Sequence, residues 1–264
     1  MYQVDAFSDR LFAGNPAAVM VLAEWLPVPL MLAIAAENNL AETAFVKPRP
    51  DGTWDLRWFT PTCEVEFCGH ATLATAHILF TELRVEADLL FHTRVGALRV
   101  SKALRGYRLD IPRMPPEAID RLPPELAGIF PVPPVAIFRN FENFFADLGS
   151  AEAVRNFVPD LAAIAKLGPV GLVVTGQEAD AAPADFVSRY FAPGAGIPED
   201  PVTGSIHATL VPYWAGKLGR DRLLAYQASP RGGWLDCELT DERVYLGGNA
   251  VTFMEATIRL PDAD

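Results

Sequence analysis

The pattern of apolar and polar positions predicts many short strands and two helices that are apolar almost all round. The two helices are expected at residues 69–83 and 203–218. A helix without a polar face is stable only when it is buried. Most other apolar segments are short, alternate with polar residues and end at Gly, Pro or Asn, which is typical of strands. Strands are expected at 2–7, 17–22, 40–46, 54–60, 87–93, 97–102, 107–111, 135–138, 144–148, 171–175, 186–191, 223–227, 234–239, 243–246 and 251–260, and shorter helices at 27–38, 151–157 and 161–167.

Three short words recur in the same order in both halves of the chain. RWFTP at 57–61 is matched by RYFAP at 189–193, which lies 132 residues later. The other two words lie 137 residues apart: HATL begins at His70 and His207, and Arg-x-Gly-x-Leu begins at Arg94 and Arg231. The second copy therefore carries extra residues in its loop, in the stretch that holds Glu199 and Asp200. A strand–loop–helix–strand unit that occurs twice predicts two similar lobes with a ligand in the cleft between them.

The boundary between the lobes is expected in the proline-rich stretch 113–130. An N-terminal lobe would span 1–113, and the C-terminal strand 250–260 could complete it, while a C-terminal lobe would span 114–249. Each lobe contains mostly strands and one long apolar helix, so an α+β fold is predicted, with two sheets that each curl around a central helix.

Composition narrows the possible partners. The 264 residues are 50% hydrophobic and carry a net charge of −11, with basic residues scattered rather than clustered. Neither nucleic acid nor an anionic membrane surface is expected as a partner. The N-terminus lacks the pattern of a signal peptide, and no apolar run reaches the ~20 residues of a membrane span, so a cytoplasmic location is expected.

The cysteines and histidines do not follow a metal-binding or disulfide pattern. Cys63, Cys68 and Cys237 form no CxxC pair, and the four histidines form no HExxH. No disulfide framework or metal site is therefore expected. The glycines match neither GxGxxG nor a phosphate-binding loop.

A few polar side chains are candidates for chemistry. Glu42 stands in the apolar run NLAETAFV, where burial would raise its pKa and suit it to general acid–base work; a surface-facing glutamate on an edge strand is the alternative. His70 and Ser205 stand near the starts of the apolar helices, where unpaired N–H groups favour an anion such as a substrate carboxylate. Asp200 precedes the second helix, and a capping role is the alternative there. His207 is expected to pack rather than react.

Four segments together resemble one known family. GNPAAV, NLAETAFV, RWFTPTCEVEFCGHATLATAH and RYFAPGAGIPEDPVTGSIHATL are similar to motifs of the phenazine biosynthesis (PhzF-like) family, within the diaminopimelate epimerase superfamily. The resemblance extends over nearly the whole chain. It implies two pseudo-symmetric lobes with an active site between them, isomerisation by proton transfer without a cofactor, and a homodimer. The founding enzyme of the family isomerises a dihydro-hydroxyanthranilate.

The resemblance also implies roles for individual residues. The catalytic glutamate of the family falls on Glu42, its histidine on His70, its aspartate on Asp200 and its serine on Ser205. Gly204 matches the glycine whose N–H faces the ligand.

Two motifs depart from the phenazine enzyme. Cys68-Gly69-His70-Ala71 stands where that enzyme has Ala-Gly-His-Pro, and Pro201-Val202-Thr203-Gly204-Ser205 stands where it has Ala-Ala-Thr-Gly-Ser. The substrate can therefore differ. Epimerase relatives use two opposed cysteines, whereas the corresponding positions here are Cys68 and Ser205, so a mechanism with two thiols is not available.

The sequence leads to one main hypothesis and two alternatives. The main hypothesis is a metal-free and cofactor-free isomerase of a small carboxylate, with Glu42 as the base. His70, Asp200, Ser205 and Cys68 would hold the substrate, and the N–H groups of Gly69 and Gly204 would stabilise developing charge. One alternative is an epimerase or racemase that uses Cys68. The other is a catalytically idle relative that binds a ligand or a protein.

Overall fold

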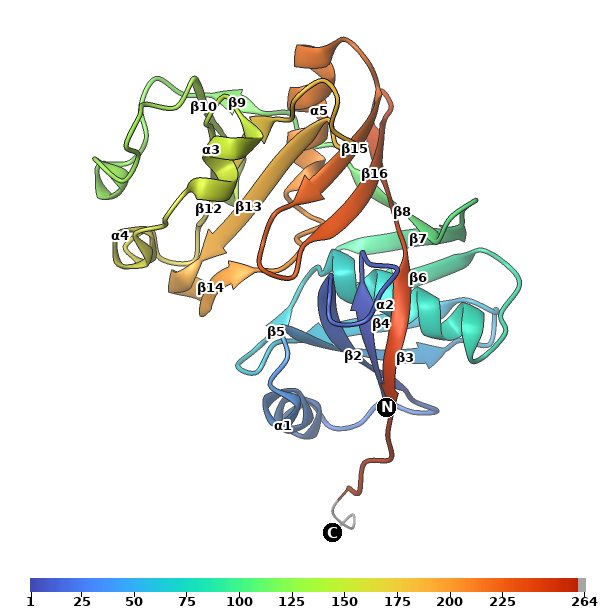
Figure 1. The fold of residues 1–264 in the computed structure, drawn as a ribbon. Coiled ribbons are helices and arrows are strands. Elements are labelled where there is room, and N and C mark those ends of the chain that lie inside the picture. Colours follow the sequence, from blue (N-terminus) through green and yellow to red (C-terminus); the bar gives the residue numbers. More distant parts are fainter. Residues whose placement is uncertain (261–264) are drawn as a thin grey trace. The chain divides into compact units, whose positions relative to one another are not determined.

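The computed structural model describes residues 1–260 and has an α+β fold, as predicted (Figure 1). The chain forms two compact units. Unit 1 comprises Met1–Phe12, Pro16–Leu109 and the described residues from Asn249 on, and unit 2 comprises Ala13–Asn15 and Asp110–Gly248. The chain therefore passes into unit 2 for three residues near its start before it completes unit 1.

Unit 1 is a set of mainly antiparallel strands with one long buried helix. Its strands are β1 (Tyr2–Ala6), β2 (Asn15–Val21, whose first residue is part of unit 2), β3 (Glu42–Pro48), β4 (Trp54–Phe59), β5 (Glu64–Val65), β6 (Leu89–Thr93), β7 (Gly96–Lys102), the first half of β8 (Tyr107–Pro112) and β18 (Ala250–Glu255). Its helices are α1 (Val28–Asn38) and α2 (Gly69–Thr81). β3 pairs with β2 in parallel and with β4 antiparallel, and β4 pairs in parallel with β6.

Unit 2 repeats this order of pairings. Its strands are β9 (Glu117–Ala118), β10 (Ala136–Arg139), β11 (Asn143–Asp147), β12 (Gly171–Gln177), β13 (Phe186–Ala192), β14 (Ile197–Asp200), β15 (Arg222–Gln227), β16 (Gly233–Leu239) and β17 (Arg243–Gly248). Its helices are α3 (Ala151–Asn156), α4 (Leu161–Ala165) and α5 (His207–Leu218), with short 3₁₀ turns η1 (Pro124–Leu126) and η2 (Pro193–Ala195). β12 pairs in parallel with β11 and antiparallel with β13, and β13 pairs in parallel with β15. The duplication predicted from the three recurring words is therefore confirmed in the strand pairing.

Helix α2 is buried along its length, as its lack of a polar face predicts. Every residue from Gly69 to Phe80 is buried, and the helix packs against β1, β3 and β18. The hydroxyl of Thr75 donates to the carbonyl of Ala71 inside the helix, and His77 contacts Tyr107 Oη at 2.8 Å and Thr252 Oγ1 at 2.9 Å. Because these buried polar groups have hydrogen-bond partners, their burial does not destabilise the helix as the burial of unpaired groups would.

Helix α5 is the counterpart of α2 in unit 2 and packs against β15, β16 and β17. It contains Pro212, which has no N–H and so cannot bond to the carbonyl of Ala208 one turn earlier. The backbone N–H of Met114 donates to that carbonyl instead, at 3.0 Å. A contact from outside the helix thus satisfies the acceptor that the proline leaves, which allows a proline in a buried helix.

The structure corrects two element boundaries and adds two short strands. The second long helix begins at His207 and not at 203, because residues 203–206 form a turn with bonds from His207 N to Gly204 O and from Ala208 N to Ser205 O. The loops before both helices contain short strands, β5 and β14, that were not expected. The last strand ends at Glu255. Among the described residues, no helix has the length and hydropathy that a membrane crossing requires.

Candidate active site

Glu42 is the first residue of β3, which is an inner strand with a hydrogen-bonded strand on each side. The strand pairs with β2 through Ala17 opposite Glu42, and with β4 from Thr43 onward. Only 12% of the Glu42 side chain is exposed. The alternative of a surface-facing glutamate on an edge strand is therefore wrong.

Two further candidates of unit 1 lie beside Glu42. His70 Nε2 is 3.2 Å from Glu42 Oε2, and His70 Nδ1 is 3.5 Å from Cys68 Sγ. Cys68 is the residue before the first turn of α2, and Gly69 and His70 form the start of that turn. Burial lowers the pKa of His70 to about 3, so its imidazole is neutral near pH 7. The first turn of the helix therefore brings a thiol and a neutral imidazole to the carboxylate of a neighbouring strand.

The same three side chains are the only group of three potential metal ligands within residues 1–260. Their donor atoms lie within 4.8 Å of one another. The thiol and the carboxylate, however, face different nitrogens of the His70 ring, whereas a histidine binds a single metal ion through one nitrogen. The three groups thus lie in a row of polar contacts rather than around one point, and metal-independent activity stays a prediction.

Asp200 ends the short strand β14 in unit 2 and is buried. Its carboxylate accepts a hydrogen bond from Asn15 Nδ2 at 2.8 Å and a short one from the Thr203 hydroxyl. Burial raises the pKa of Asp200 to about 6, although both hydrogen bonds act in the opposite direction. Its ionisation is thus moved close to neutral pH, where a group can bind or release a proton during a reaction.

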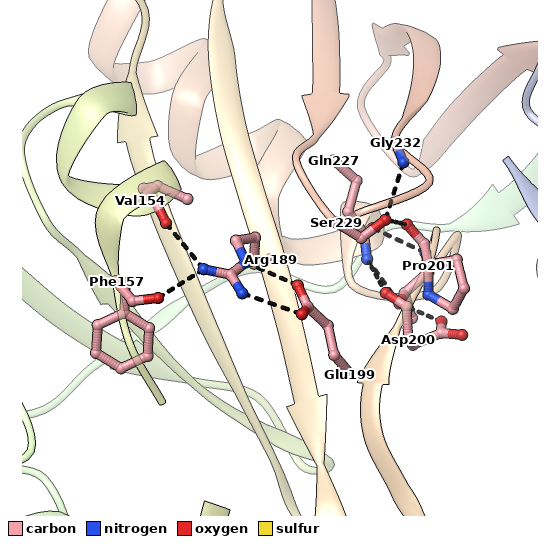
Figure 2. A network of polar contacts seen from close by, with 10 residues as sticks. Val154, Phe157, Arg189, Glu199, Asp200, Pro201, Gln227, Ser229 and Gly232 are labelled. Carbon is pink, nitrogen blue, oxygen red and sulfur yellow. Dashed lines mark hydrogen bonds and ion pairs between the residues drawn. The ribbon is translucent and has the colours of Figure 1, made fainter. Parts of the chain in front are cut away.

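The backbone around Asp200 is held by β15 and the residues that follow it (Figure 2). Gln227 Nε2 donates to the carbonyl of Asp200 at 2.9 Å, and Gln227 Oε1 accepts from the N–H of Thr203 at 2.8 Å. Ser229 Oγ donates to the carbonyl of Pro201 and accepts from the N–H of Gly232. The loop between β14 and α5 is therefore fixed on both sides of the carboxylate.

An ion pair fixes β14 itself. Arg189 forms two hydrogen bonds with the Glu199 carboxylate, at 2.7 and 3.0 Å, and its other terminal nitrogen donates to the carbonyl of Phe157 at 2.7 Å (Figure 2). Unit 1 has the same device, since Arg57 binds both carboxylate oxygens of Glu64 at 2.7 and 2.8 Å. Both arginines belong to the recurring word Arg-x-Phe-x-Pro, which explains that part of the pattern.

Gly204 and Ser205 stand in the turn before α5 and not in its first helical turn. No hydrogen bond to the N–H of Gly204 or Ser205 is formed within the described residues, so both groups are available to an anion. Ser205 also lines a pocket of about 390 Å³ together with Tyr190, Asn143 and Val170. These features fit a substrate-binding role for Ser205 and Gly204.

The strand register identifies the residue of unit 2 that corresponds to Glu42. Thr43 lies opposite Phe59 in unit 1 and Leu172 lies opposite Phe191 in unit 2, so Gly171 is the counterpart of Glu42. A Cβ atom on Gly171 would lie 2.2 Å from a ring carbon of Tyr190 and 2.6 Å from Asn143 Oδ1. Unit 2 has no side chain where unit 1 has its carboxylate.

Sequence reasoning missed three groups that position the candidates. Asn15 and Gln227 hold Asp200 and its loop, and the Thr203 hydroxyl bonds to the same carboxylate. Asn15 lies in GNPAAV, a segment that the sequence marks only by its resemblance to the family. Gln227 carried no signal, because a buried glutamine at the end of a strand resembles any polar strand residue.

Known proteins with similar sequences and structures were found over nearly the whole chain. A model of the family described as phenazine biosynthesis-like protein matches residues 4–256. An uncharacterized isomerase of Pseudomonas aeruginosa is 47% identical over 98% of both chains, and the human phenazine biosynthesis-like domain-containing protein is 36% identical over 98% of both. The crystal structure of a PhzF family protein from Enterococcus faecalis is 44% identical, covers 96% of both chains and superposes with a TM-score of 0.89.

More distant structures share the fold alone. A probable proline racemase from Agrobacterium radiobacter is 12% identical and superposes with a TM-score of 0.64, over 98% of this chain and 92% of its own. The predicted architecture, two pseudo-symmetric lobes of the diaminopimelate epimerase type, is therefore confirmed.

Proposed function

Since the chain belongs to the phenazine biosynthesis-like family, we propose that it is a cofactor-independent isomerase of a small carboxylate, with Glu42 as general base. The observation that carries this proposal is the Glu42 carboxylate, 12% exposed and 3.2 Å from a neutral imidazole. Such a group can accept a proton from substrate carbon and return it elsewhere. The name of the Pseudomonas aeruginosa relative, an isomerase, supports the same reaction class.

The second set of residues is assigned to substrate binding. Ser205 and the free N–H groups of Gly204 and Ser205 suit a carboxylate. Asp200, with its pKa near 6, suits a hydroxyl or amino group that gains or loses a proton. That both sets of residues serve one substrate stays a prediction. It is tested by measuring the dissociation constant of a small aromatic or amino carboxylate. Ser205→Ala should raise this constant, and Glu42→Gln should leave it nearly unchanged.

Isotope exchange tests the reaction class directly. A panel of small carboxylates is incubated with the protein in D₂O, and incorporation of deuterium at carbon is followed by NMR and mass spectrometry. Exchange that Glu42→Gln abolishes supports the proposal. Binding without exchange for any carboxylate in the panel would instead support the idle, ligand-binding alternative.

The epimerase alternative rests on Cys68, whose thiol is buried beside His70. A second opposed thiol is not provided by the other cysteines: Cys237 is buried in β16 with its sulfur near the carbonyl of Leu235, and Cys63 is exposed. If Cys68 were itself the acid or base, Cys68→Ala would abolish turnover as completely as Glu42→Gln does.

Metal independence is a separate prediction of the proposed mechanism. Because general acid–base catalysis by Glu42 needs no Lewis acid, turnover should survive exhaustive treatment with EDTA and 1,10-phenanthroline. Metal analysis of the treated protein provides the control. A loss of turnover that is restored by one stoichiometric divalent metal would contradict the mechanism.

A further inference from the structure

Thr203 is held at each of its polar atoms by other residues of unit 2. Its N–H donates to Gln227 Oε1 at 2.8 Å, and its carbonyl oxygen accepts from His207 Nδ1 at 2.9 Å. Its hydroxyl oxygen lies 3.2 Å from Gln227 Nε2, and the hydroxyl forms a short hydrogen bond to Asp200 Oδ2. Both the backbone and the side chain of this loop residue are therefore fixed.

The contacts of Gln227 allow only one orientation of its amide group. A backbone N–H only donates, so the atom that faces the N–H of Thr203 is the amide oxygen. A backbone carbonyl only accepts, so the atom that faces the carbonyl of Asp200, at 2.9 Å, is the amide nitrogen (Figure 2). The same amide nitrogen faces the Thr203 hydroxyl, and it can only donate a hydrogen there.

The direction of the Thr203 hydroxyl hydrogen follows from this orientation. Because the nitrogen of Gln227 donates, the hydroxyl oxygen accepts on that side and keeps its own hydrogen for another partner. Among residues 1–260, the only acceptor bonded to this hydroxyl is Asp200 Oδ2. The hydrogen therefore points at the carboxylate.

We propose that Gln227 is a positioning residue of the candidate site: it orients the Thr203 hydroxyl so that its hydrogen stabilises the ionised form of Asp200. Gln227 bonds to the backbone carbonyl of Asp200 and not to its carboxylate, so it acts on the carboxylate through Thr203. The effect on turnover rests on the proposed role of Asp200, whereas the effect on the proton affinity of Asp200 does not.

Burial and hydrogen bonding act on Asp200 in opposite directions. Burial raises its pKa to about 6, and the bonds from Thr203 and Asn15 hold the pKa below the value that burial alone would give. The charge of Glu199 also raises the pKa of Asp200, although Arg189 pairs with Glu199. The Thr203 hydroxyl thus helps to keep the ionisation of Asp200 close to neutral pH.

Other titratable or charged side chains stand near this network. Burial lowers the pKa of His207 in α5 to about 4, so near pH 6 its imidazole is neutral and adds no positive charge. Tyr190 of β13 lies opposite Asp200 in the strand register. Arg231 donates to two backbone carbonyls in the segment 13–14. The hydrogen bonds to the carboxylate oxygens of Asp200 come from Asn15 and Thr203.

The proton affinity of Asp200 is measured by carbon-13 NMR of its side-chain carboxyl group in the full-length protein, with Asp200→Asn to assign the resonance. Thr203→Val removes the hydroxyl at nearly constant volume, so Asp200 should bind its proton about 10- to 100-fold more tightly, the weight of one hydrogen bond to a charged group. Thr203→Ser keeps the hydroxyl and should titrate close to the wild type.

A double-mutant cycle separates positioning through the hydroxyl from a general structural role. Gln227→Met removes the amide at similar length and should tighten proton binding by Asp200 about 3- to 10-fold, since the hydroxyl is then less well oriented. In a Thr203→Val background the same substitution should have no further effect. An equal effect in both backgrounds would overturn the proposal, because Gln227 would then act through the backbone of Asp200.

Thr209→Val is the matched control, because it removes another buried hydroxyl of unit 2, which is bonded to Asn140 Nδ2 at 2.9 Å. It should leave the titration of Asp200 unchanged. If Gln227→Met does not fold, the two Thr203 variants still decide: the same pKa of Asp200 in Thr203→Val and Thr203→Ser would overturn the proposal.

Kinetics connect this inference to turnover. With an active substrate, the limb of the pH–rate profile that belongs to Asp200 should move to higher pH in Thr203→Val and stay in place in Thr203→Ser. The expected titrations together with an absence of carbon-bound exchange in the wild type would uphold this inference and refute the proposed function.

Discussion

The two copies of the strand–loop–helix unit share their framework and differ where chemistry is expected. The shared parts are the order of parallel and antiparallel pairings, the bidentate Arg–Glu ion pair and the histidine near the start of the buried helix. The differences lie at equivalent register positions. Unit 1 has Glu42 where unit 2 has Gly171.

At a second pair of equivalent positions, unit 2 has the carboxylate and unit 1 has an apolar residue. Val65 lies opposite Trp58 in unit 1, and Asp200 lies opposite Tyr190 in unit 2. Because Trp58 and Tyr190 occupy the same place in the recurring word, Asp200 stands where unit 1 has a valine. Each copy thus has a carboxylate at one of these two register positions, on a different strand. The framework is therefore the same in both copies, whereas the strand that carries the candidate acid differs.

The largest effect is expected from removing the carboxylate of unit 1. Glu42→Gln keeps the size of the side chain but removes its ability to accept a proton. Because general acid–base catalysis contributes about 10²–10⁴-fold, turnover should fall at least by that order, while ligand binding changes little. Measured kcat and dissociation constants for both proteins check this. Near-normal turnover would show that the acid of unit 1 is not the base.

The Arg–Glu pairs test whether the shared framework is equally important in both copies. Arg189→Ala should cost about 3 kcal/mol of unfolding free energy, since it leaves Glu199 and the carbonyl of Phe157 without this donor. Arg57→Ala should cost about 1 kcal/mol, because Arg94 also pairs with Glu64. Urea denaturation measures both values. Equal losses would mean that the added contact of Arg189 with the backbone contributes nothing.

Gly171 tests the position at which the copies differ most. A methyl group there would collide with Tyr190 and Asn143, so Gly171→Ala should destabilise the protein by about 1–3 kcal/mol. Gly216→Ala is the matched control, because this glycine is exposed in α5 with open space at its Cβ, and alanine there should stabilise by about 0.5–1 kcal/mol. A tolerated Gly171→Ala would show that the Tyr190 ring moves aside easily.

The smallest expected effect concerns the acid of unit 2. Because the folded-state pKa of Asp200 is raised from 3.8 to about 6, its contribution to stability is present at low pH and is lost as pH rises through 6. Between pH 5 and pH 8 the wild type should therefore lose about 1 kcal/mol that Asp200→Asn does not lose. Unfolding curves of both proteins at the two pH values measure the difference. Parallel pH dependences would place the titration on another group.

The sequence predicted the framework better than the loops that complete the site. The apolar pattern of the sequence located both buried helices, and the recurring words located the duplication. Each of these signals is a local pattern of a few residues. The start of α5 was placed four residues too early, since Thr203 and Ser205 resemble helix caps while the structure uses the Thr203 hydroxyl for Asp200. Long-range partners such as Asn15 and Gln227 have no local signature, because the strand pairing that brings them to Asp200 is set by distant segments.

The three residues Ala13–Asn15 lie near the start of the chain but contact Asp200 and Arg231 of unit 2. They belong to unit 2, where Arg231 donates to the carbonyls of Ala13 and Gly14 and where Asn15 bonds to Asp200. A gene fragment encoding only residues 110–248 would encode nearly all of unit 2 but not this short segment. Such a fragment would expose Asp200 to water and leave Arg231 without two acceptors. A circular permutant whose termini lie within an exposed turn of unit 1 would avoid both losses. A fragment of unit 2 that is to keep the environment of the Asp200 carboxylate therefore has to include Ala13–Asn15.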